Sequence, residues 1–257
     1  MKRSFTACVV LLLLPAAALG ASAKQPAPPG SFAGAPAQYT HFTAAELQRG
    51  FMALAFGSDL RLGARPKGVR RFDRPIRLHV AVGGTVDRAA AMRRIVGEYA
   101  EKVTNLKLTL AEEAASADIE VRLIDEREFS AALAAAFGTV TARAFVAKTN
   151  PQCMTSVKSD PDGKVVRAVS FIIVDKGDAV FLDCAYHELL HAFGLSNHDQ
   201  RNPWTTLNQK RMVGYLTAYD RSLLTLLYDP RMRPGMTPAE ARALLPPLIK
   251  DLGLAAQ

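Results

Sequence analysis

The sequence has few long apolar runs, few cysteines and no cluster of basic residues. Its one long apolar run, residues 7–19, is interrupted by Pro15 and is shorter than the roughly 20 apolar residues that a membrane-spanning helix needs. The 32 lysines and arginines are scattered along the chain, and no nucleic-acid-binding motif accompanies them. We therefore expect neither a nucleic-acid partner nor stable membrane insertion of the mature chain.

Residues 1–23 have the composition of a secretory signal peptide. Lys2 and Arg3 precede the apolar run, and small residues at 21–23 offer a cleavage site after Ala23. An uncleaved membrane anchor is the alternative. Cleavage takes away two cations and no acids, which lowers the formal net charge from +8 to +6. We expect a periplasmic or secreted protein whose moderately basic surface is either simply solvated or faces anionic polymers.

Only three cysteines are present, and Cys8 lies within the apolar run. In an oxidising compartment the remaining two, Cys153 and Cys184, are expected to pair. Such a bridge closes a loop of about 30 residues and contributes roughly 3–4 kcal/mol. The alternative is that Cys184, three residues before His187, is a metal ligand.

The mature chain is long enough for one domain with two lobes around a cleft. Residues 24–42 are rich in proline, alanine and glycine and predict a flexible leader. Residues 43–257 then form a single catalytic domain, with an N-terminal lobe to about residue 194 and a C-terminal lobe over 195–257. We find no internal repeat.

Apolar periodicity predicts an α+β fold. Strands are expected at 76–82, 106–110, 118–123, 139–148 and 165–174, and helices at 43–56, 87–103, 126–137, 180–193, 219–228 and 237–250. The strands would form a twisted mixed sheet with one backing helix and one active-site helix, followed by an irregular to helical C-terminal part. If the strand at 165–174 is the sheet edge over the cleft, it can bind an extended peptide by β-addition.

Three of the five histidines fall within twelve residues. His187 and His191 are spaced i, i+4 on a helix, so both project from one face and reach a single zinc ion at about 2.0–2.1 Å. Glu188, next to the first ligand, reaches a metal-bound water and serves as general base. Gly194 accepts a positive φ and reverses the chain, so that His198 can be the third ligand. A structural helix that carries this pattern by chance is the alternative.

The His-Glu-x-x-His-x-x-Gly pattern resembles the zincin metallopeptidases, and their metzincin branch more than the gluzincin branch. Metzincins have a histidine or aspartate three residues after the glycine, where this chain has Asn197 and places His198 one residue later. A one-residue bulge would bring His198 onto the metal, and Asp199 or Asn197 are the alternatives. The resemblance implies a zincin-like fold with a methionine turn at Met212 and Tyr215 as a catalytic oxyanion donor; a core methionine and a surface tyrosine are the alternative.

Residues 45–247 also resemble a bacterial envelope family catalogued only as a domain of unknown function, through segments 55–58, 74–77, 194–197 and 227–237. This resemblance favours the fold and export. The chain's own residues predict an exported zinc (Zn2+) metallohydrolase, a monomeric peptidase that acts on peptide or protein substrates. A catalytically silent binding protein with the same scaffold and a metal-dependent cell-wall amidase are the alternatives.

Overall fold

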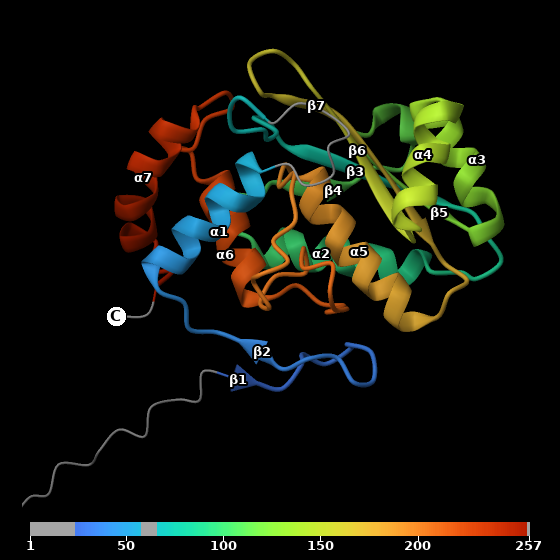
Figure 1. Ribbon diagram of the computed structural model, residues 1–257, viewed down its shortest axis with the longest axis horizontal. Coiled ribbons are helices and arrows are strands. Elements are labelled where there is room, and N and C mark those ends of the chain that lie inside the picture. The colour runs from blue at the N-terminus through green and yellow to red at the C-terminus, as the bar shows by residue number, and fades with distance from the viewer. Residues whose placement is uncertain (1–23, 58–65, 256–257) are drawn as a thin grey trace, which may run out of the picture.

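Five strands form one mixed sheet at the centre of the molecule (Figure 1). The computed structural model describes residues 24–57 and 66–255, so the predicted signal peptide lies outside the described residues. Within this sheet only the β6–β7 pair is antiparallel, and the strand order is β4-β3-β5-β7-β6. The strands are β3 (Ile76–Val82), β4 (Leu108–Leu110), β5 (Ile119–Ile124), β6 (Cys153–Ser159) and β7 (Val165–Ile173). The predicted α+β fold with a mixed sheet is confirmed.

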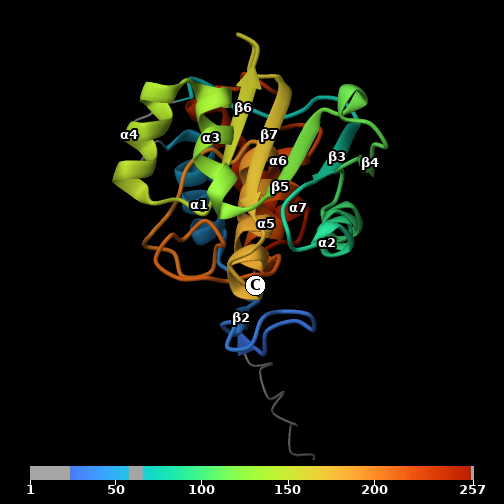
Figure 2. The ribbon, with the colours of Figure 1, turned by 90° about the vertical axis from the view of Figure 1, so that its right-hand side faces the viewer.

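The two faces of the sheet carry different apolar clusters because side chains alternate along each strand. Val121 and Ile172 belong to the main core, which also includes buried residues of α2 (Ala89–Lys102) and α5 (Asp178–Ala192). Phe171 packs instead in a smaller cluster with Leu133 of α3 (Glu126–Phe137). Figure 2 shows α3 and α4 beside the β6 and β7 end of the sheet, and α2 beside the β3 and β4 end.

Helices from both ends of the chain pack together beside the sheet (Figure 1). They are α1 (Ala44–Phe56), α6 (Ala218–Tyr228) and α7 (Pro238–Asp251). The predicted capping boxes begin α1 at Thr43 and α7 at Thr237. Although α1 precedes the sheet in sequence, its buried stripe faces the C-terminal helices. No helix of the described residues is long and apolar enough to cross a membrane.

The strand predicted at 139–148 is wrong, because Thr139–Thr149 forms helix α4. Gly138, with a φ of 84°, ends α3 and lets α4 fold back against it. Ala142 of α4 joins the same apolar cluster as Leu133. This tertiary packing overrides the strand preference of the β-branched residues at 139–141.

The strand at 165–174 does not meet the condition set for peptide binding, because it is not an edge of the sheet. Strand β7 lies between β5 and β6, so the edge is β6 at residues 153–159, which the sequence analysis did not predict. Its side chains are almost all half-buried and show no apolar alternation. An edge strand that borders a cavity on one side lacks the pattern by which buried strands are recognised.

Residues 24–42, predicted as a flexible leader, make contacts with the rest of the domain. Strands β1 (Lys24–Gln25) and β2 (Gln38–Tyr39) pair antiparallel. The Tyr39 ring stacks on Trp204 with centroids 4.4 Å apart, and the Tyr215 hydroxyl donates to the Pro36 carbonyl oxygen at 2.8 Å. These contacts bring the segment against the part of the chain that follows the candidate ligands.

Candidate metal centre

Helix α5 carries two of the three candidate ligands. Leu189 and Leu190 are fully buried and hold the helix in the core. His187 and His191, one turn apart, lie side by side with ring centroids 4.8 Å apart. The Thr155 hydroxyl of β6 donates to the main-chain carbonyl oxygen of Glu188 at 3.1 Å. Apolar burial and this bond to the edge strand together fix the helix.

The chain reverses directly after α5. Gly194 has a φ of 120°, and a β-carbon there would lie 2.0 Å from the Arg70 carbonyl oxygen. Only glycine fits this position, for both conformational and steric reasons. The reversed chain brings His198 back to the helix, where its Nε2 lies 3.1 Å from the Nε2 atoms of His187 and His191.

The three Nε2 atoms form a triangle with sides of 3.1 Å. A tetrahedral zinc site with bonds of about 2.0–2.1 Å has ligand–ligand edges of about 3.3 Å. If each Nε2 is a hydrogen-bond acceptor, none of the three can donate to another. One cation can interact with all three lone pairs at once. The three histidines are therefore positioned to bind a metal ion.

Hydrogen bonds at the opposite ring nitrogens favour the metal-binding form of two histidines. His187 Nδ1 lies 3.0 Å from the Thr206 carbonyl oxygen, and His191 Nδ1 lies 2.6 Å from that of Leu195. Because a carbonyl only accepts, each Nδ1 carries the proton and each Nε2 presents a lone pair. Burial, with the charges of the other two imidazoles and of Arg70, lowers the pKa of His191 well below its usual value. This histidine is therefore neutral.

A buried carboxylate of α6 holds the main chain that accepts from His187. The Thr206 amide and hydroxyl both donate to Asp220 Oδ2 at 2.8 Å, and the Thr205 hydroxyl donates to its Oδ1 at 2.5 Å. Burial raises the pKa of Asp220, and these hydrogen bonds lower it. The sequence reasoning missed this residue, because the Thr217-x-x-Asp220 spacing predicts only a helix cap, which is also present.

Glu188 has the environment of a reactive carboxyl group. Its side chain is 3 % exposed, and Oε2 has no hydrogen-bond partner among the described residues. Burial raises its pKa to about 8. Buried polar atoms are usually paired, so an unpartnered carboxyl oxygen beside the three histidines is not explained by a structural role.

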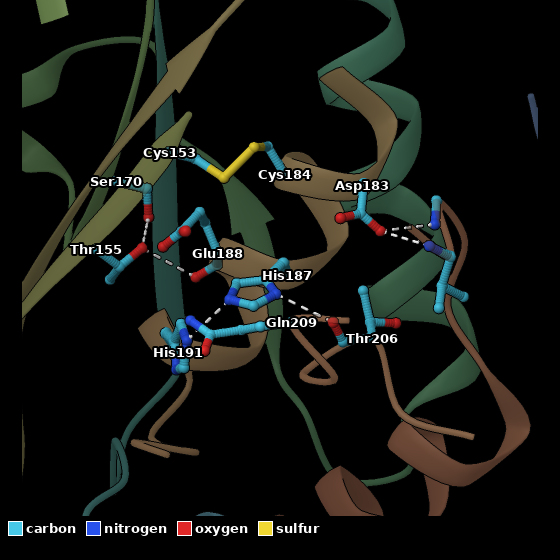
Figure 3. Close-up of a disulfide and its surroundings, with 12 residues drawn as sticks. Cys153, Thr155, Ser170, Asp183, Cys184, His187, Glu188, His191, Thr206 and Gln209 are labelled. Carbon is cyan, nitrogen blue, oxygen red and sulfur yellow. Dashed lines mark hydrogen bonds between the residues drawn. A yellow bond between two sulfur atoms is a disulfide. The ribbon is translucent and has the colours of Figure 1, made fainter. Parts of the chain in front are cut away.

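A cavity of about 690 Å³ opens over the histidines and Glu188. Residues 153–157 of β6 line one side of it, and the loop at 206–212 contributes to the lining. The predicted Cys153–Cys184 disulfide is confirmed and joins β6 to α5 (Figure 3), so Cys184 is not a metal ligand. On the loop, the Gln209 amide lies 3.2 Å from His198 Nε2.

The reserve candidates for the third ligand have other contacts. Asn197 Nδ2 donates to the Ala53 carbonyl oxygen at 3.0 Å, and Asp199 Oδ1 accepts from the Arg201 amide at 3.2 Å. His198 is therefore the residue that joins the two helix histidines, one position later than the metzincin spacing.

Two expectations drawn from the metzincin resemblance are not met. The Tyr215 hydroxyl donates to Pro36 and does not line the cavity, so it is not placed as an oxyanion donor. Met212 is 41 % exposed and lines the cavity, whereas a methionine turn needs a buried side chain beneath the ligands. The packed segment at 24–42 explains the first difference, because it supplies the partner of Tyr215.

Comparison with known proteins places the centre inside the region that a family model matches. Residues 44–247 match the model of a family described as "Protein of unknown function (DUF2927)". A search of curated proteins finds no match. The matched segment contains the whole five-stranded sheet, all three histidines and Asp220.

Proposed function

The chain belongs to this family of proteins of unknown function, and we propose that it is an exported zinc-dependent hydrolase. The bonds that it cleaves would be peptide bonds. One observation carries the proposal: three imidazole Nε2 atoms meet at 3.1 Å, and Glu188, whose Oε2 is unpartnered, lines the same cavity. Both lie in the wall of a cavity large enough for part of a peptide.

The ligand set supports zinc and a catalytic rather than a structural site. Structural zinc sites are usually closed by four protein ligands, whereas three histidines leave one position open. Zinc held at this triangle would polarise a carbonyl oxygen and lower the pKa of water towards about 7. A mixed sheet with an antiparallel edge strand, the backing helix α2 and the ligand-bearing helix α5 supports a zincin-like architecture for this chemistry.

Glu188 is the residue that moves protons in this proposal. It adjoins the first ligand on α5, and it is one of the residues that line the cavity. The carboxylate takes a proton from the attacking water and returns it to the leaving amine.

The edge strand β6 gives a peptide substrate a place to bind. Within the described chain β6 pairs only with β7, so its other edge has free main-chain groups. Residues 153–157 of that strand line the cavity. An extended peptide can add to this edge through main-chain hydrogen bonds, a role that residues 165–174 could have had only as the edge strand.

The Cys153–Cys184 disulfide supports action outside the cytoplasm, because disulfides persist in oxidising compartments. This agrees with the signal peptide predicted at residues 1–23, and the protein would work in the periplasm or after secretion.

The test separates metal binding from proton transfer. We expect elemental analysis of the purified mature protein to find about one zinc per chain. Glu188→Gln should keep the zinc and lower peptide hydrolysis by at least about 100-fold, because it removes the base and no ligand. Assays with casein and with muropeptides beside each other distinguish a protease from a cell-wall amidase.

Glu101→Gln, an exposed position near the end of α2, is the matched control and should behave like the wild type. Wild-type hydrolysis by Glu188→Gln, or a purified protein that binds no zinc, would contradict the proposal.

A further inference from the structure

Cationic side chains outnumber free carboxylates in the lining of the cavity. Arg70, Lys210 and Arg211 line it, together with only two carboxyl groups, those of Asp183 and Glu188. Asp183 Oδ1 already accepts from the main-chain amides of Val213 and Gly214. The cavity therefore attracts negative charge before any contribution from a metal ion is counted.

Two of these cations lack the partners that buried arginines normally have. The Nε atoms of Arg70 and Arg211 are buried and have no hydrogen-bond partner. Among the described residues neither guanidinium forms an ion pair. An unpaired buried donor costs free energy, and a guanidinium offers a planar fork that matches a carboxylate. Each side chain is therefore suited to an anionic ligand.

Arg70 is the one fixed beside the metal centre. Its carbonyl oxygen packs against Gly194, directly after the ligand helix, and its charge acts on His191. The next residue is firmly anchored, because the Arg71 guanidinium donates to the carbonyl oxygens of Leu227, Asp229 and Met232. Arg211 lies on the loop after His198, and its charge acts on Tyr215, outside the cavity lining.

We propose that Arg70 binds a carboxylate of the substrate on the His191 side of the metal centre, so that the protein selects peptides with a carboxylate close to the cleaved bond. The proposal rests on the hydrolase function above and names its substrate class. Lys210 and Arg211 add positive potential on the loop side. The carboxylate has two chemical sources, an acidic side chain or the C-terminus of the peptide.

Matched peptide pairs test the proposal in zinc-loaded mature protein. One set differs only by glutamate or glutamine at each position around the cleaved bond, and the other only by a free or amidated C-terminus. For the set that supplies the carboxylate, we expect kcat/KM to favour the acid by about 10- to 100-fold, as a charge-assisted hydrogen-bonded pair allows. The set that shows the preference identifies the source.

Variants assign the preference to one side chain. Arg70→Gln should abolish it, mainly through a higher KM, and Arg70→Lys should restore part of it. Arg211→Gln, which also removes a cavity cation with an unpartnered Nε, should retain most of it. Arg221→Gln, exposed on α6, should match the wild type. A preference that survives in Arg70→Gln, or equal kcat/KM for both members of every pair in an active wild type, would overturn the assignment.

A binding measurement separates this proposal from the hydrolase function. Calorimetric titration of the same peptide pairs into zinc-loaded Glu188→Gln needs no turnover. The carboxylate site is supported if the acidic peptide binds roughly tenfold or more tightly than its partner and Arg70→Gln loses this preference. This holds even if the wild type hydrolyses nothing. In that case only the hydrolase function fails. Equal affinity for both members of every pair overturns the carboxylate site and leaves the hydrolase function standing.

Discussion

The two halves of the metal centre are built in different ways. His187, Glu188 and His191 lie on one helix, which is fixed by fully buried leucines and by contacts with the edge strand. His198 lies on the segment between α5 and α6, which contains no helix or strand. Two largely buried carboxylates anchor that segment. Asp183 holds Val213 and Gly214, and Asp220 holds Thr205 and Thr206.

Apolar packing positions the helix half of the centre, whereas buried polar anchors position the loop half. Removing a polar anchor should therefore loosen the loop half while leaving the helix half in place. Removing a ligand should affect the metal and leave both halves folded. The following predictions separate these two effects.

The largest effect is expected when the helix ligands are removed. The double variant His187→Ala/His191→Ala should lose zinc entirely, since His198 alone cannot hold the ion. His198→Ala keeps two ligand nitrogens on a rigid helix, so it should still bind zinc, but more weakly. Changing a residue that hydrogen-bonds to a ligand lowers metal affinity roughly 10- to 100-fold. Loss of the ligand itself should lower zinc affinity by more than that. Competition with a chromophoric chelator measures both affinities, and circular dichroism checks the fold.

His41→Ala, an exposed position outside the centre, is the control and should bind zinc as the wild type does. Asn197→Ala and Asp199→Ala should have smaller effects than His198→Ala. Full zinc binding by the double variant would refute the centre, and wild-type affinity in His198→Ala with loss of zinc in Asp199→Ala would move the third ligand to Asp199.

The helix half of the site was predictable from sequence and the loop half was not. An i, i+4 spacing fixes how His187 and His191 lie because helix geometry is local. Gly194 was recognisable for the same reason. Thr206, Gln209 and Asp220 are brought to the histidines only by tertiary packing, so no spacing in the chain points to them. The local signal also failed for Tyr215, whose hydroxyl is occupied by a residue 179 positions away in sequence.

The same distinction applies to the fold. Strands β3 and β5 were predicted because their buried faces alternate with polar residues. Intrinsic preference predicts a strand at 139–148, but packing on α3 makes Thr139–Thr149 a helix. Strand β6 shows no apolar alternation, since one side borders the cavity. Sequence therefore predicted the elements that bury apolar side chains periodically and missed the edge that the substrate would meet.

Breaking the Asp220 anchor should produce the next largest effect. Asp220→Ala leaves the Thr206 amide and two hydroxyls without their acceptor, so we expect the free energy of unfolding to fall by about 3 kcal/mol. Zinc affinity should fall about 10- to 100-fold, because the carbonyl oxygen that orients His187 is no longer held. Urea denaturation and chelator competition measure the two effects.

Thr206→Val is the matched comparison, because it removes one hydroxyl bond to Asp220 and keeps the carbonyl that accepts from His187. Its zinc affinity should stay closer to the wild-type value. If Asp220→Ala lowers stability but leaves zinc affinity unchanged, the anchor supports the fold and does not position His187.

The smallest effect concerns the second anchor and depends on pH. Burial raises the pKa of Asp183 from its ordinary value of 3.8 to about 6, despite hydrogen bonds from two main-chain amides that lower it. Between these two values the folded state binds a proton that the unfolded state has released, so the contribution of Asp183 to stability falls as pH rises from about 4 to about 6, by at most about 3 kcal/mol.

Asp183→Asn cannot ionise and should lack this slope. Urea denaturation of metal-free wild type and Asp183→Asn from pH 4 to 7 should therefore show the difference in unfolding free energy moving in favour of the variant as pH rises. A difference that stays constant over this range would mean that Asp183 is already ionised at pH 4, and that its two amide bonds outweigh its burial. In that case Asp183 would be a charged anchor over the whole range, and its contrast with the apolar helix half would be sharper still.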